Sequence, residues 1–132
     1  MPDITLPITS LAALVLGCTH LLLTIRVIRI RRRDGVVLGE NEDRVLTKAI
    51  RGQANASEQM PLGLIMLALC ELQGGPAALL WLLALALMAG RGIHAVYFGI
   101  HGTHWRLRVL GMLLTLIAQT GLLASLAFVL IT

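Results

Sequence analysis

The chain has 132 residues, of which 57% are hydrophobic and only 14% are charged. A soluble domain of this length cannot bury so much apolar surface, so the composition predicts an integral membrane protein with a single domain. Eleven Lys and Arg against seven Asp and Glu give a formal charge of +4. No aromatic residues alternate with the basic ones, so this excess indicates membrane topology and excludes a nucleic-acid-binding surface.

The first predicted helix covers residues 4–30. Its first 22 residues carry no charge, which is enough to span a hydrocarbon core of about 30 Å. Arginines then cluster at Arg26, Arg29, Arg31, Arg32 and Arg33, and Asp34-Gly35 predicts a turn. No basic region precedes the apolar stretch, so we expect no cleaved signal peptide.

The second predicted helix covers residues 42–72, with Asn41 or Asp43 as its N-cap and with Pro61 expected to kink it. One set of polar residues, the polar stripe, advances by 4, 3, 4 and 3 positions and therefore lies on one face of a helix. Its members are Arg44, Lys48, Arg51, Asn55 and Glu58. Exposing such a stripe to lipid is costly, so it must face protein or a water-filled cavity.

The third and fourth predicted helices cover residues 76–100 and 106–131. In the fourth, Gly111, Thr115 and Gln119 recur every four residues and predict the close approach of another helix. The fold class is therefore all-α, an integral membrane four-helix bundle. The first and third loops hold nearly all the basic residues, so the positive-inside rule predicts that both are cytoplasmic and that both termini are on the other side.

These positions bring the charged and polar residues of all four helices to one level, near the cytoplasmic membrane boundary. They are Arg26, Arg29, Arg51, Asn55, Glu58, Arg91, His94, Arg106 and Arg108. The basic groups outnumber Glu58, and clustered like charges in a low dielectric are unfavourable without a counter-ion. We therefore expect an anionic ligand here. Glu58 offers a place for an ammonium group, so a ligand with two carboxylates and one amine fits the set.

The segment Arg51-x-x-x-Asn55-x-x-Glu58-x-x-Pro61, followed by an apolar run that ends in Glu71, resembles the second-helix signature of the MAPEG family, the membrane-associated proteins in eicosanoid and glutathione metabolism. Arg91-x-x-His94 and the segment from Arg108 to Thr115 resemble its bacterial members. The resemblance implies a homotrimer in a bacterial inner membrane, with glutathione as co-substrate bound between neighbouring subunits.

Carried over to this chain, the resemblance implies that four residues of the second helix bind glutathione: Arg51, Gln53, Asn55 and Glu58. Glu58 would bind the γ-glutamyl amine. The other candidate contacts at this level are Arg26, Arg29, Arg91, His94 and Tyr97. Arg108, or alternatively Arg106, would stabilise the thiolate. The expected activity is a transferase or peroxidase that acts on a lipophilic electrophile or a peroxide, with membrane lipid or the lipophilic substrate as a partner. Tyr97 is the only tyrosine, which argues against leukotriene or prostaglandin chemistry.

Two other functions remain open. One is a non-catalytic ligand-binding scaffold of the same fold. The other is a small four-helix transporter, which is disfavoured because such proteins depend on an acidic residue in the first helix and residues 4–25 contain none. A metal site is not expected, because no Cys or acidic residue is spaced to join His94, His101 and His104.

Overall fold

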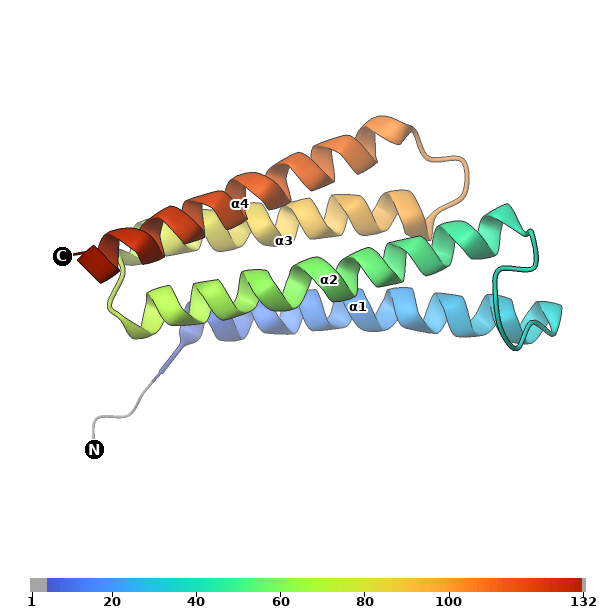
Figure 1. Ribbon diagram of the computed structural model, residues 1–132, viewed down its shortest axis with the longest axis horizontal. Helices are drawn as coiled ribbons and strands as arrows, with labels where there is room; N and C mark the ends of the chain where they lie inside the picture. Colours follow the sequence, from blue (N-terminus) through green and yellow to red (C-terminus); the bar gives the residue numbers. More distant parts are fainter. Residues whose placement is uncertain (1–4, 132) are drawn as a thin grey trace.

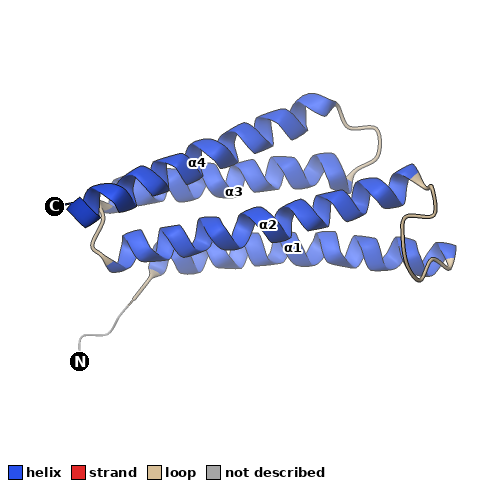
Figure 2. Cartoon of the chain, in the orientation of Figure 1, coloured by secondary structure: helices blue, strands red, loops and turns tan. Residues whose placement is uncertain are grey.

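The chain folds into four α-helices in the computed structural model, which describes residues 5–131 and contains no β-strand among them (Figures 1 and 2). The helices are α1 (Pro7–Asp34), α2 (Arg44–Leu72), α3 (Ala77–Gly99) and α4 (Trp105–Ile131). This confirms the predicted all-α bundle. Helices α1, α3 and α4 are long and apolar enough to cross a membrane, so the chain is an integral membrane protein.

Helix α2 is different, because the polar stripe occupies its first half. It is 29 residues long and is not among the candidate membrane spans found within the described residues. That it crosses the membrane with its neighbours therefore stays a prediction. It continues without a break through Pro61, and Asp43 caps its start by accepting a hydrogen bond of 2.8 Å from the backbone N–H of Val45.

Helix α1 extends beyond its predicted end at residue 30, through the arginine cluster to Asp34. It stops where Gly35 adopts a left-handed conformation with φ of 66°, which glycine reaches without steric cost. The helix begins at Pro7, so residues 5 and 6, which were expected in it, precede it, and the expected start at residue 4 lies outside the described residues.

The start of α1 is capped from another helix. Leu6 has no side-chain oxygen to offer, and the carboxylate of Glu71, near the end of α2, takes that role. It accepts hydrogen bonds from the backbone N–H groups of Ile8 and Thr9, at 2.9 and 2.8 Å, and from the Thr9 hydroxyl at 2.7 Å. A carboxylate at this position satisfies donors that the helix leaves unpaired and interacts favourably with its dipole.

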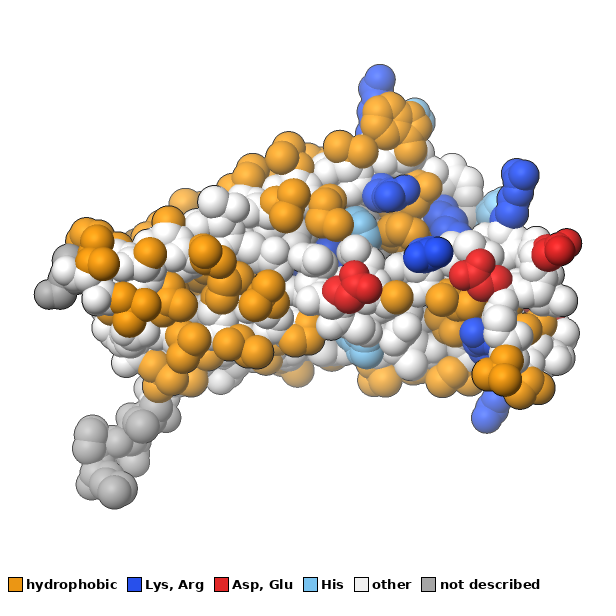
Figure 3. All heavy atoms as spheres, in the orientation of Figure 1, with side chains coloured by type: hydrophobic (Ala, Val, Ile, Leu, Met, Phe, Trp, Pro, Cys, Tyr) orange, Lys and Arg blue, Asp and Glu red, His pale blue; other side chains and the backbone are white. Residues whose placement is uncertain are grey.

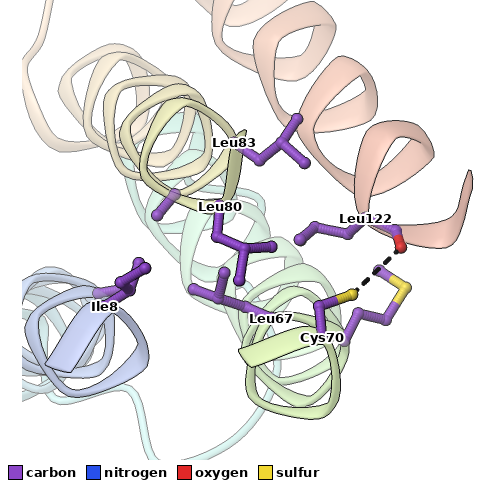
Figure 4. Packing of buried hydrophobic residues seen from close by; sticks show 9 residues of the cluster. Ile8, Leu67, Cys70, Leu80, Leu83 and Leu122 are labelled. Carbon is purple, nitrogen blue, oxygen red and sulfur yellow. Dashed lines mark hydrogen bonds between the residues drawn. The ribbon is translucent and has the colours of Figure 1, made fainter. Parts of the chain in front are cut away.

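The same end of the bundle holds the largest apolar core (Figure 4). Its labelled members are Ile8, Leu67, Cys70, Leu80, Leu83 and Leu122, which come from all four helices. The Cys70 thiol donates to the backbone carbonyl of Leu122 at 3.5 Å, so this cysteine is a packing residue.

Helices α3 and α4 approach most closely at glycines, as the spacing of Gly111 and Thr115 predicted. A Cβ atom on Gly111 would lie 2.6 Å from the backbone N of His94 and 2.7 Å from the carbonyl oxygen of Gly90. Gln119 adds a link to α2, since its side chain donates to the carbonyl oxygen of Gln59 at 3.0 Å. These contacts determine how near α4 comes to His94.

The α1–α2 and α3–α4 loops lie at one end of the bundle, and the α2–α3 loop lies at the other (Figure 1). On the face shown in Figure 3, the charged side chains gather in the half of the molecule near the α1–α2 and α3–α4 loops. The other half of this face shows hydrophobic side chains and no charged ones. The bundle therefore concentrates its charge at one end.

Replacing Gly111 by Ala is expected to lower stability by about 1–3 kcal/mol, because the added methyl group meets backbone atoms that cannot move aside. Thermal unfolding in detergent measures the loss. Gly92→Ala is the matched control, since a Cβ there meets no atom within 4 Å and alanine is the better helix former. Equal melting temperatures for the two variants would contradict this role of Gly111.

Candidate functional site

The polar stripe of α2 faces a cavity of about 400 Å³ at the charged end of the bundle. We call this the main cavity. It is lined by Lys48, Arg51, Ala54, Asn55 and Glu58 from α2, by His94 and Phe98 from α3, and by Arg108 and Met112 from α4. Residues from three helices, predicted from spacing and depth to share one level, thus surround one space.

Three of the four charged groups of the main cavity have no side-chain partner among residues 5–131. The fourth, Lys48, donates to the backbone carbonyl of Ile100 at 3.3 Å and to the Thr103 hydroxyl at 3.4 Å. Over residues 5–131 the recorded ion pair joins Arg33 to Asp34, and it lies elsewhere. Arg51, Glu58 and Arg108 are exposed and form no hydrogen bond or ion pair with another described residue. The main cavity is therefore lined by three cationic side chains, those of Lys48, Arg51 and Arg108, and by one carboxylate, that of Glu58. No other acidic residue lines it to neutralise the excess positive charge.

Asn55 is held in place by Arg91, which is fully buried behind the cavity wall. The Nη2 group of Arg91 donates to Asn55 Oδ1 at 2.9 Å and lies 3.1 Å from His94 Nδ1. A guanidinium has only donors, so His94 Nδ1 must be the acceptor and its proton must be on Nε2. Arg91 therefore fixes the orientation of Asn55 and the tautomer of His94. Its Nε and Nη1 atoms are buried without a recorded partner.

Gln53 lies away from the main cavity, although the family resemblance implied that it binds glutathione. Gln53 is two positions away from both Arg51 and Asn55, so its side chain points about 200° around the helix axis from theirs. Its amide nitrogen is 3.3 Å from Ser57 Oγ, which is in turn 2.8 Å from His20 Nε2. His20 and Ser57 line a second, mostly apolar cavity between α1 and α2.

Three other predicted contacts are also separate from the main cavity. Arg26 lines a small cavity next to it, and Arg29 is exposed on α1. The Tyr97 ring supports Lys48, whose Nζ atom lies 4.1 Å from the ring centroid, and packs edge-on against Phe98.

Of the two helix-four arginines, Arg108 lines the main cavity. Arg106 is exposed, with its guanidinium carbon 6.0 Å from the Trp105 ring centroid. The geometry therefore favours Arg108 for any role in the cavity.

Lys48 and Phe98 line the main cavity but lie outside the predicted ligand set. The sequence indicated Lys48 as a cavity residue, since it precedes Arg51 by three positions in the polar stripe. It did not indicate Phe98, because an aromatic residue on an apolar helix usually packs in a core. Here it packs against Gly52 so closely that a Cβ on this glycine would lie 2.4 Å from the Phe98 Cβ.

The arrangement suits a small anionic molecule that also carries an ammonium group. Arginine and lysine donate charge-assisted hydrogen bonds to carboxylates, and Glu58 accepts from an amine. Within residues 5–131, no three His, Cys, Asp or Glu side chains gather in a way that would hold a metal ion.

The chain is similar to one protein family and to an inner membrane protein of Escherichia coli. The family model described as "MAPEG family" matches residues 9–128. The protein named "Inner membrane protein YecN" from Escherichia coli K12 is 31% identical over 86 residues, which is 65% of this chain and 64% of the relative, so less than two thirds of the relative's length is covered. The same protein from Escherichia coli O6:H1 matches equally. No solved structure matches the chain.

Replacing Asn55 by Ala is expected to destabilise the protein by about 1.5–3 kcal/mol, because buried Arg91 then loses its oxygen acceptor. Gln53→Ala removes the same amide group from the other face of α2, where its recorded hydrogen bond is exposed, and should cost well under half as much. Thermal unfolding of both variants in detergent tests the difference. A larger loss for Gln53→Ala would show that Arg91 does not depend on Asn55.

Proposed function

Because the chain belongs to the MAPEG family, we propose that the main cavity binds glutathione and that the protein is a membrane glutathione transferase or peroxidase. Family membership indicates a glutathione-related function at the membrane. The observation that carries the specific proposal is that Arg51, Glu58 and Arg108 line one cavity without a hydrogen-bond or ion-pair partner among residues 5–131. Glutathione has two carboxylates, one amine and one thiol, which complement these groups.

Each side chain that lines the main cavity then has a distinct role in binding glutathione. Glu58 accepts hydrogen bonds from the γ-glutamyl amine, and Arg51 donates to a carboxylate. The Oδ1 atom of Asn55 is already bound by Arg91, so its amide N–H groups are free to donate to a ligand oxygen. His94 is a donor to the cavity through Nε2–H, because Arg91 occupies Nδ1.

Arg108 is proposed to stabilise the glutathione thiolate. A cysteine thiol has an ordinary pKa of about 8.5, so the thiol form predominates at neutral pH until a nearby cation favours the anion. The thiolate sulfur then bonds to an electrophilic carbon as the leaving group departs, or to a peroxide oxygen as the O–O bond breaks. We propose that the substrate is lipophilic, because the protein is embedded in the membrane.

We also propose that the protein is a homotrimer in a bacterial inner membrane, with the charged end of the bundle in the cytoplasm. The relatives named as inner membrane proteins and the basic first and third loops support this location and orientation. The polar group of Gln53, Ser57 and His20 on the outer face of α1 and α2 supports contact with another subunit, because exposing it to lipid is costly.

Glu58→Gln is expected to weaken glutathione binding by about tenfold or more, because the ammonium loses a charged partner. Isothermal titration of the detergent-purified protein measures the dissociation constant. Glu42→Gln, an equal charge change in the α1–α2 loop, should leave it unchanged. If the wild type shows no binding of glutathione, the proposed function is wrong.

Arg108→Ala is expected to reduce conjugation of chlorodinitrobenzene by about 100-fold, since the thiolate loses its stabilising cation. Arg106→Ala is the matched control and should retain near wild-type turnover. Initial rates at saturating glutathione provide the measurement. Wild-type binding without any turnover of electrophiles or peroxides would instead support the non-catalytic scaffold.

A further inference from the structure

A smaller cavity of about 150 Å³ lies beside the main cavity and is formed by parts of the chain that are far apart in sequence. We call it the basic cavity. It is lined by Arg26 from α1, by Arg44, Val45 and Lys48 from the first turns of α2, and by His101 and Gly102 from the α3–α4 loop. Neither the proposed glutathione site nor the apolar core includes this space.

The basic cavity is strongly cationic. Three of its six lining residues are Arg or Lys, a fourth is His, and none is acidic. The acidic residues near the start of α2 do not line this cavity. Glu40 accepts a hydrogen bond from the Thr47 hydroxyl at 3.0 Å, and Asp43 accepts one from the backbone N–H of Val45. Like charges that face one small space repel each other unless an anion joins them.

Arg26 is half-buried at the wall of this cluster, and its Nε atom is buried without a hydrogen-bond partner among residues 5–131. An unpaired donor on a cation is costly. An anionic oxygen in the basic cavity would offset this cost through its attraction to the guanidinium charge.

The size of the basic cavity limits what that ligand is. Pockets for whole small molecules have volumes of about 300–1,000 Å³, whereas this one has room for a single compact group. A phosphate group presents several anionic oxygens within that space and can accept from several cations at once. A carboxylate presents only two oxygens, which leaves more of the surrounding donors unpaired.

We propose that the basic cavity binds a phosphate group, separately from the proposed glutathione site. The group belongs either to a free phosphate or phosphomonoester or to the headgroup of an anionic phospholipid. Both sources supply the same oxyanion chemistry, and both are accessible at the charged end of the bundle. Lys48 lines both cavities and forms their common wall.

The test uses the full chain, purified without phosphate in a zwitterionic detergent. Isothermal titration with inorganic phosphate at constant ionic strength should show saturable binding, weakened about tenfold in Arg26→Gln and in Arg44→Gln. Arg29→Gln removes an equal charge from an exposed position on α1 that does not line the basic cavity, and it should bind like wild type. Arg44→Lys keeps the charge and should retain most of the binding. Thermal unfolding without phosphate verifies that each variant is folded.

A second arm distinguishes the two sources. The same titration is repeated in nanodiscs of phosphatidylcholine alone and of phosphatidylcholine mixed with phosphatidylglycerol. If phosphatidylglycerol abolishes phosphate binding by the wild type, the lipid headgroup occupies the basic cavity. If binding is equal in both discs, the ligand is a free phosphate or phosphomonoester.

Three results would overturn the proposal. The first combines two observations. The wild type binds no phosphate in detergent or in phosphatidylcholine discs, and phosphatidylglycerol raises the melting temperatures of wild type and Arg26→Gln equally. The second is an equal loss of binding in Arg29→Gln, which would indicate general surface charge. The third is binding that survives in Arg26→Gln and is lost in Arg51→Ala, which would place the phosphate in the main cavity and leave the glutathione proposal to its own test.

Discussion

The structure depends on one constraint, which is that hydrocarbon offers no hydrogen bonds to a polar group. Each polar side chain within the bundle must therefore find a partner in the protein or face a water-filled space. The chain meets most of this demand at its two ends. At one end Glu71 caps the otherwise uncapped start of α1, and at the other the charged residues surround cavities. Between the ends the helices pack mainly through apolar side chains.

The polar stripe of α2 divides into two parts with different roles. Asn55 is turned inward and is tied to Arg91 and, through it, to His94, so this part forms the rigid back of the main cavity. Lys48 is also paired, since it donates to the backbone carbonyl of Ile100 and to the Thr103 hydroxyl. Arg51 and Glu58 are exposed and have no hydrogen-bond or ion-pair partner among residues 5–131. A stripe that served only to join helices would pair all its charges with neighbouring helices. Here Arg51 and Glu58 remain available to a ligand or to another subunit.

The fold was largely predictable, because it follows from length and periodicity. Apolar stretches long enough to cross a bilayer predicted the helices, and the recurrence of Gly111 and Thr115 predicted the close contact of α3 with α4. The helix ends were less accurate. Helix α1 continues to Asp34 because basic residues favour the last turn of a helix, so the arginines extend α1 where a loop was expected.

The sequence by itself determined that the chain is a helical membrane protein and that Arg51, Asn55 and Glu58 share one face, since helical geometry follows directly from spacing. Only the tertiary structure decided which distant residues join that face. It selected Arg108 over Arg106, placed Arg91 behind the main cavity wall, and separated Arg26 and Gln53 from this site. The physical reason is that rotation and depth of one helix relative to another depend on side-chain packing, here on contacts such as Gly52 with Phe98, which no periodicity encodes.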